Sequence, residues 1–255
     1  MELTLKVYIY KEGKRPIFHQ PHLRGIYSSE GWFMKLMEDS HQFVTRDPQK
    51  AHLFYPPYSA RQLQRARYVP NSHNLKPLSM FLQNYMNMLA AKYPSGTEHM
   101  AQIIFLLLII IGPCTLKDHE ELSRNTITAL CNADISEGIF VSGKNVSLPE
   151  TTISNPRRPL RNLGGKRVSQ RPILAFFAGN MHGPVGPKLL KYWNNKDESI
   201  RIYGPLPRRV SKVMSYSEHM KSSKYCLCPM GYEVNSPRIV EAIYYECVPF
   251  NEVLN

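Results

Sequence analysis

The chain has 255 residues, 43% of them apolar and 11% aromatic, so it can bury a core in one large domain or two Rossmann-sized units. This composition excludes an intrinsically disordered chain. The balance of 32 basic and 20 acidic residues gives a charge of +12, typical of a solvated basic surface or of polyanionic partners. Nucleic acid is disfavoured because the basic residues are scattered in ones and twos, and no helix pairs a basic stripe with stacking aromatics.

In chain order, strands and helices alternate through the first half. A strand is predicted at Val7–Tyr10, and a helix follows the polar residues Ser28–Glu30. A short buried strand at Ala51–Tyr55 and a helix at Leu78–Ala91 repeat this order. The spacing also predicts a helix over Leu116–Ala129, with acidic residues in its first turn. The alternation favours an α/β fold.

A change in composition marks a boundary between two domains. Residues 155–171 are rich in Pro, Arg, Gly and Ser, which predicts a linker between a domain at 1–154 and a domain at 172–255. The second domain opens with a buried strand at Ile173–Ala178 that ends in the small residues Gly179 and Asn180. Parallel strands commonly enter a ligand-facing loop in this way. The remaining predicted elements are strands at Ile200–Gly204 and Tyr225–Pro229, and helices at His219–Ser223 and Ser236–Tyr245.

Cysteine spacing and one glycosylation triplet bear on chemistry and compartment. No CxxC pair occurs, which argues against a zinc site. The five cysteines leave at least one thiol unpaired in an oxidising compartment, so their number does not fix the compartment. Asn145 begins an Asn-Val-Ser triplet, an N-glycosylation acceptor if the chain enters the secretory lumen.

The segment Cys228–Ala242 carries the clearest chemical pattern. Asn235 or Ser236 can cap a helix that has proline at its first position, so free N–H groups and the positive helix end suit a diphosphate. Arg238 in the first turn can bind phosphate with two hydrogen bonds, and Glu241 can accept from ribose or sugar hydroxyls. Alternatively, Glu241 closes a capping box onto Ser236 or pairs with Arg238.

This segment resembles the donor-half signature of the plant exostosin-like glycosyltransferases, glycosyltransferase family 47. The family pattern Cys-Pro-x-Gly-Tyr-Glu-Val-Asn-Ser-Pro-Arg-x-Val-Glu-Ala-Ile-x-Tyr-Glu-Cys-Val-Pro matches Cys228–Pro249 almost completely. The other segments that resemble the family are Leu5–Tyr10, Gly25–Phe33, Ala51–Tyr55, Leu130–Asp134 and Ala178–Gly183.

The resemblance implies a GT-B-like fold of two Rossmann-like domains, the second incomplete here, with the nucleotide-sugar held mainly by the second domain and the acceptor by the first. It implies an enzyme that transfers a sugar from a nucleotide-sugar, with a UDP-sugar as the expected donor, to a cell-wall polysaccharide or glycoprotein glycan. It also implies a type II Golgi membrane protein with a lumenal catalytic region. The expected donor-binding residues are Gly179, Asn180, Asn235, Ser236, Arg238 and Glu241.

No metal ion or other cofactor is expected. The chain has no Asp-x-Asp, the carboxylate pair with which many glycosyltransferases hold a divalent ion. The helix N-terminus and Arg238 are expected to neutralise the departing diphosphate instead. No catalytic base is assigned; His182 is a candidate, and the alternative for it is a hydrogen-bonding role in its loop.

The chain departs from the family pattern at two places. Codons for Ser95–Gly112 read one nucleotide out of register can spell the polar family motif, so we hypothesise a compensated frameshift in the gene or its predicted model. The apolar run Ile103–Ile111 that results is about half the roughly 20 residues needed to span a bilayer. The residues after Phe250 resemble a segment found shortly downstream in the family, so we expect the second domain to be truncated. From the strand-like start of the chain we also expect that this sequence carries neither the signal nor the membrane anchor of the family. The alternative function is therefore a non-catalytic remnant, or a pseudogene product, that at most binds nucleotide or glycan.

Overall fold

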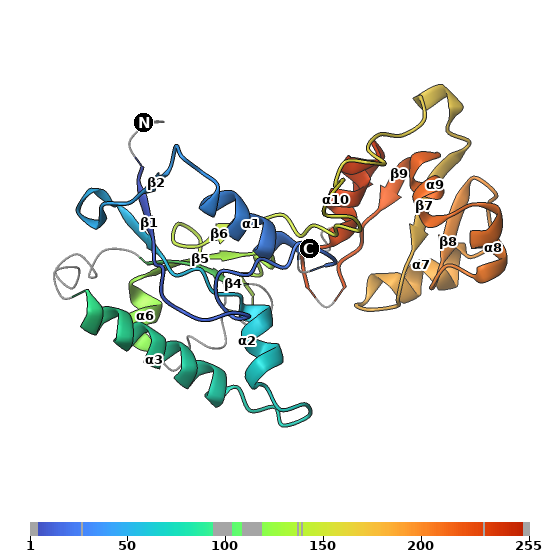
Figure 1. The fold of residues 1–255 in the computed structure, drawn as a ribbon. Helices are drawn as coiled ribbons and strands as arrows, with labels where there is room; N and C mark the ends of the chain where they lie inside the picture. The colour runs from blue at the N-terminus through green and yellow to red at the C-terminus, as the bar shows by residue number, and fades with distance from the viewer. Residues whose placement is uncertain are drawn as a thin grey trace. The chain divides into compact units, whose positions relative to one another are not determined.

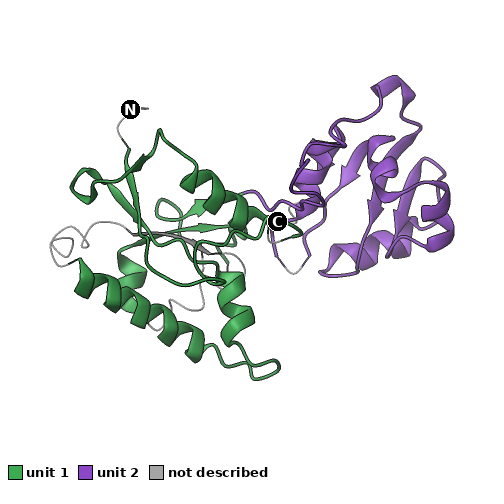
Figure 2. Ribbon diagram, viewed as in Figure 1, with its two compact units in different colours: residues 1–148 green, residues 149–255 purple. Residues whose placement is uncertain are grey.

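The chain forms two compact α/β units in a computed structural model, Met1–Leu148 and Pro149–Asn255 (Figure 2). The structure describes residues 5–26, 28–93, 104–108, 119–136, 138, 140–231 and 233–251. Each unit is built on one parallel sheet, which confirms the predicted fold class (Figure 1).

Unit 1 contains a six-stranded sheet of order β2-β1-β3-β4-β5-β6. Its strands are β1 Val7–Ile9, β2 Val44–Thr45, β3 Leu53–Tyr55, β4 Ile104–Leu108, β5 Thr126–Leu130 and β6 Val146–Ser147. Its helices are α1 Ser28–Glu38, α2 Ala60–Arg67, α3 Lys76–Lys92 and α6 Glu120–Arg124, with a 3-10 turn at Pro48–Lys50.

Helices pack on both faces of this sheet, against side chains that alternate along the strands. Tyr8 and Phe54 belong to a core cluster with residues of α2 and α3, such as Leu63 and Leu82. Val7 and Tyr55 belong to a second cluster, against which Phe33 of α1 packs. Because neighbouring residues of a strand point to opposite faces, two helical layers cover one sheet, as is typical of doubly wound folds.

One predicted helix was wrong. Of the range 116–129, residues 120–124 are helical and Thr126–Leu130 form strand β5, while 116–118 lie outside the described residues. The β-branched Thr126, Ile127 and Thr128 suit a strand, and β5 pairs with β4 from Ile104↔Thr126 to Leu108↔Leu130. Tertiary pairing therefore overrides the acidic helix-start signal that precedes it.

The apolar run at 103–111 contributes an inner strand to the sheet of unit 1. Residues 104–108 of this run form β4, between β3 and β5, and the rest lies outside the described residues. Within the described ranges, no helix is both long enough and apolar enough to cross a membrane.

Unit 2 contains a four-stranded parallel sheet of order β10-β9-β7-β8. Its strands are β7 Ile173–Ala178, β8 Ile200–Tyr203, β9 Ser223–Leu227 and β10 Val248–Phe250. Its helices are α7 Val185–Trp193, α8 Arg208–Val213, α9 Tyr216–Lys221 and α10 Pro237–Tyr244, with a 3-10 turn at Val168–Gln170. The chain moves from β7 to β8 on one side and then returns to β9 on the other. The strand order therefore reverses between β7 and β9.

The predicted linker at 155–171 is hydrogen-bonded to unit 2. Gly164 N–H donates to Tyr244 O at 2.9 Å, and Lys166 N–H donates to Lys221 O at 3.1 Å. The buried Arg171 donates to the carbonyls of Lys166 and Ser223, at 2.7 and 3.0 Å, and also to that of Glu246. These bonds make the segment part of unit 2, and the division between the two compact units lies ahead of it, between Leu148 and Pro149.

Candidate functional site

The loops that follow β7 and β9 lie against each other at the carboxyl end of the unit 2 sheet. Gly183, in the loop after β7, has a φ of +72°, and a Cβ built on it would lie 2.6 Å from Gly231 O in the loop after β9. Only glycine fits this close approach without strain. The two loops meet where the strand order reverses, the position at which open α/β sheets bind ligands.

Arg238, in the first turn of α10, reaches the end of β7. Its Nη2 donates to Ala178 O at 3.4 Å, and its guanidinium carbon lies 5.0 Å from the centroid of the Phe177 ring. A Cβ on Gly179 would lie 1.8 Å from the same Nη2, so the bare glycine leaves room for the guanidinium. Within the described part of the chain, the buried Nε has no hydrogen-bond partner. The guanidinium is thus held in place while it retains an unused donor.

Ser236 precedes α10 in the extended conformation of an N-cap, with Pro237 as the first helical residue. Its side chain makes no capping bond, and its buried Oγ lacks a partner among the described residues. Its N–H donates to Asn235 Oδ1 at 2.9 Å. A buried hydroxyl at the positive end of a helix can donate to an anion there.

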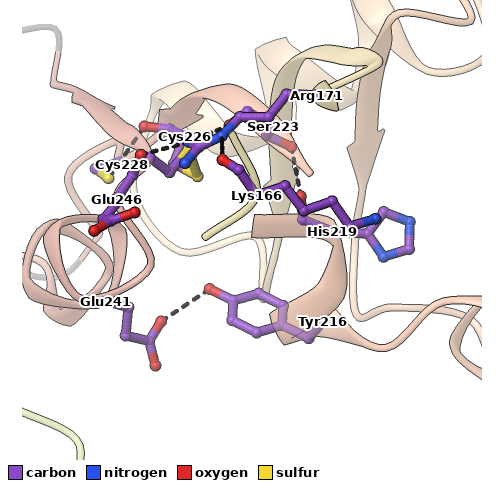
Figure 3. Close-up of a disulfide and its surroundings, with 10 residues drawn as sticks. Lys166, Arg171, Tyr216, His219, Ser223, Cys226, Cys228, Glu241 and Glu246 are labelled. Atoms are coloured by element: carbon purple, nitrogen blue, oxygen red, sulfur yellow. Dashed lines mark hydrogen bonds between the residues drawn. A yellow bond between two sulfur atoms is a disulfide. The ribbon is translucent and has the colours of Figure 1, made fainter. Parts of the chain in front are cut away.

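Glu241 lies one turn further along α10 and is bonded to α9. Its Oε2 accepts from Tyr216 Oη at 2.9 Å (Figure 3). Burial raises the pKa of Glu241, and the Tyr216 hydrogen bond and the charge of Arg238 partly oppose this rise. The carboxylate therefore bonds to Tyr216 rather than closing a capping box onto Ser236.

The structure places the residues singled out by sequence in three regions. Gly179, Asn235, Ser236 and Arg238 come together where the start of α10 meets the end of β7, and Glu241 lies one turn further along α10, bonded to Tyr216 of α9. Asn180 is exposed in the loop after β7, and so is His182, whose Cβ would lie 3.8 Å from a Cβ on Gly231. Asn145 is in unit 1, directly before β6, and is partly exposed.

Sequence reasoning missed Tyr216 and a disulfide. Tyr216 follows Ser215, which caps α9 by accepting from Glu218 N–H at 3.2 Å, so the Ser-x-x-Glu pattern could have marked this helix start. Cys226 and Cys247 form a disulfide that joins β9 to the start of β10. Among the described residues, no group of three or more His, Cys, Asp or Glu could hold a metal ion.

Two Rossmann-like α/β units, each built on one parallel sheet, fit the GT-B glycosyltransferase fold. The chain belongs to the exostosin GT47 family, whose Exostosin GT47 domain model matches residues 1–250.

Relatives with curated names agree with this assignment. A probable glycosyltransferase of Arabidopsis thaliana is 44% identical over 267 residues, which cover 100% of this chain and 50% of the relative. A probable glucuronosyltransferase of Oryza sativa subsp. japonica is 26% identical over 274 residues, covering 96% of this chain and 59% of the relative. A probable beta-1,4-xylosyltransferase of Arabidopsis thaliana is 24% identical over 272 residues, which cover 96% of this chain and 62% of the relative. The chain spans about half the length of the first of these relatives.

Proposed function

We propose that this chain is a glycosyltransferase region that transfers a sugar from a UDP-sugar to a cell-wall polysaccharide or a glycoprotein glycan. The observation that carries the proposal is the pair of unused buried donors, Arg238 Nε and Ser236 Oγ, at the start of α10. Buried donors without partners are costly, and the phosphate oxygens of a donor substrate would satisfy them. Membership of the GT47 family supports sugar transfer over the other reactions that this fold hosts.

The reaction would be a direct displacement at the anomeric carbon. The acceptor oxygen forms a bond to that carbon and loses its proton, while the bond from the carbon to the diphosphate oxygen breaks. Negative charge then collects on the departing diphosphate, where Arg238 and the positive end of α10 stabilise it. The proposal includes no metal ion and assigns no catalytic base.

The proposed location is the lumenal side of the Golgi membrane. The Cys226–Cys247 disulfide supports it, because disulfides persist in oxidising compartments. The acceptor triplet at Asn145 fits the same location, since N-glycans are added in the secretory pathway.

Sugar transfer is tested directly by mass spectrometry of acceptor oligosaccharides incubated with the chain and each of several UDP-sugars. Transfer by the wild type that is lost in Arg238→Ala supports the proposal. UDP binding without transfer to any acceptor would favour the non-catalytic alternative, in which the chain only binds nucleotide.

A further inference from the structure

Positive charge is concentrated in residues 155–171 of unit 2, called the basic segment below. Six of its residues are basic and none is acidic. Five of the six are exposed, and none of these five forms an ion pair with a described residue: Arg157, Arg158, Arg161, Lys166 and Arg167. Cations that no neighbouring carboxylate neutralises attract an anionic partner.

The basic segment is hydrogen-bonded to the helices beside it. The Tyr244 hydroxyl of α10 donates to Pro159 O at 2.9 Å and accepts from Asn162 N–H at 3.2 Å. Lys166 N–H donates to the carbonyl of Lys221, the last residue of α9, at 3.1 Å. These bonds hold the backbone that carries the cations at set positions on unit 2.

A cavity of about 540 Å³ lies between the basic segment and α10. On the helix side it is lined by the rings of Tyr244 and Tyr245. On the side of the basic segment it is lined by four residues whose side chains can donate hydrogen bonds: Asn155, Arg158, Arg161 and Asn162. Its volume is within the usual range for sites that bind small molecules.

This lining has the chemistry of a site for an acidic sugar. A guanidinium binds a carboxylate with two parallel hydrogen bonds, and an amide both donates to and accepts from hydroxyl groups. Tyrosine rings offer apolar surface to the C–H face of a sugar ring. The ammonium group of Lys221 lies 5.6 Å from the centroid of the Tyr245 ring and adds positive charge beside the cavity.

One carboxylate also faces the cavity. Among the described residues that line it, Glu241 is the only acidic one, and its Oε2 accepts from Tyr216 Oη at 2.9 Å. Two arginines, Arg158 and Arg161, line the same cavity. The net charge of the lining side chains is therefore positive, which favours an anionic ligand over a cationic one.

We propose that this cavity binds a uronate unit of the acceptor, with its carboxylate paired to Arg158 and Arg161, and that the acceptor is therefore an anionic polysaccharide. The inference rests on the proposed function, because it names the substrate class of that sugar transfer and assigns part of the acceptor to unit 2. Arg157, Lys166 and Arg167 do not line the cavity and suit further carboxylates of the same chain.

A polysaccharide fits these observations better than nucleic acid does. The cavity offers amides and tyrosine rings to a single sugar unit, whereas nucleic acid is bound mainly through its phosphates. The Cys226–Cys247 disulfide in the same unit is typical of secretory compartments, where polysaccharide chains are present and nucleic acid is not.

The test measures, by calorimetry, the affinity of the 255-residue chain for an oligogalacturonate and for its methyl ester. The two ligands have the same sugar chain, but esterification removes the negative charges. The wild type should bind the ester at least about tenfold more weakly, because an ester cannot form a charged pair with arginine. Salt should weaken binding of the free acid. Equal affinity for the two forms, or no binding of either by a folded chain, would overturn the inference.

The double variant Arg158→Gln with Arg161→Gln locates the site. It should bind the oligogalacturonate about tenfold more weakly than the wild type does. The matched control is Arg208→Gln with Arg209→Gln, which removes the same charge from exposed residues of α8 and should keep wild-type affinity. Equal losses in the two variants would show attraction by net charge alone and would overturn the site. Tighter binding of a single-stranded oligonucleotide of equal charge, lost in the first variant alone, would assign the site to nucleic acid instead.

Tyr244→Phe tests whether the fixed position of the basic segment matters. It removes the hydroxyl that bonds to Pro159 and Asn162, so it should weaken oligogalacturonate binding severalfold. Tyr192→Phe is the matched control, since Tyr192 of α7 is 61% exposed and should keep wild-type affinity. A lower melting temperature with unchanged affinity would show that Tyr244 is only structural, which would overturn its role in the site.

Failure of this inference can be told apart from failure of the proposed function. Arg158→Gln with Arg161→Gln should keep the UDP affinity of the wild type, and Arg238→Ala should keep its oligogalacturonate affinity. A chain that binds UDP and transfers sugar to neutral oligosaccharides, without affinity for the oligogalacturonate, would overturn this inference alone. A chain that binds the oligogalacturonate at Arg158 and Arg161 but neither binds UDP nor transfers sugar would overturn the proposed function and support the anionic saccharide site.

Discussion

The guanidinium of Arg238 lies over the ring of Phe177, with its carbon 5.0 Å from the ring centroid and its Nη2 3.4 Å from Ala178 O. The ring and the carbonyl both belong to β7, whereas Arg238 belongs to α10, 60 positions later in the chain. This contact holds a cation at the carboxyl end of the sheet, where two loops converge. The placement depends on Gly179, because any Cβ there would overlap the guanidinium.

Gly179→Ala should therefore weaken UDP binding about as much as Arg238→Ala does. The new Cβ would lie 1.8 Å from Arg238 Nη2, so the guanidinium must leave its place over Phe177. Gly204→Ala is the matched control, since a Cβ there meets nothing within 4 Å. The UDP affinity of both variants is measured by calorimetry. Wild-type affinity in Gly179→Ala would show that the position of Arg238 is unimportant for UDP binding.

Ser236→Ala should separate binding from stability. Because the Ser236 hydroxyl makes no capping bond and is buried without a partner among the described residues, its removal costs no hydrogen bond and should not lower the free energy of unfolding. UDP affinity should fall about tenfold, the effect of one lost hydrogen bond to phosphate. Ser215→Ala, which removes a formed cap on α9, should show the opposite, with about 1 kcal/mol less stability and unchanged affinity. Equal effects of the two variants on urea unfolding would contradict this account.

The disulfide should stabilise unit 2. Cys226 and Cys247 are 21 positions apart, and closing a loop of this length contributes about 3 kcal/mol. The double variant Cys226→Ala with Cys247→Ala should therefore melt at a lower temperature than the wild type. A reducing agent should lower the melting temperature of the wild type and leave that of the double variant unchanged. If a reducing agent left the melting temperature of the wild type unchanged, the disulfide would not stabilise unit 2.

Burial of Glu30 should make stability depend on pH. The carboxylate accepts from Ala60 N–H at 2.6 Å and from the Ser59 hydroxyl, and burial raises its pKa from 4.5 to about 7. Between these values the folded state holds a proton that the unfolded state releases. The stabilisation is thus fully present below pH 4.5 and is lost as the pH rises through 7, by roughly 3 kcal/mol.

Glu30→Gln removes this titration and keeps an acceptor oxygen. As the pH rises from 4.5 to 8, the free energy of unfolding of the wild type should fall relative to that of the variant. Burial also raises the pKa of Glu150 to about 7, but Glu150 is present in both proteins and its effect cancels in the difference. A flat difference curve would contradict the assignment to Glu30.

Much of the secondary structure could be predicted from local patterns. The apolar run of β7 and the helix that begins after Ser236 are both marked by residues next to each other in the chain. The strand Thr126–Leu130 was missed because its sheet partners, β4 and β6, are not visible in a local window. Acidic residues just before it indicated a helix, and that helix extends only over Glu120–Arg124.

The geometry of the site could be predicted only in part. Sequence placed Arg238 and Ser236 at a helix start, because capping and proline preferences are local. It could not reveal the bond between Tyr216 and Glu241, which are 25 positions apart and on different helices. The disulfide was hidden for a similar reason, since five cysteines allow many pairings.

The most direct test of the central claim is calorimetric titration of UDP into the wild-type chain, Arg238→Ala and Arg209→Ala. Arg209 is an exposed residue of α8, so its variant makes the same change of charge away from the start of α10. We predict micromolar binding by the wild type and Arg209→Ala, and affinity at least tenfold weaker in Arg238→Ala. Equal binding by all three proteins, or no binding by a folded wild type, would contradict a diphosphate site at the start of α10.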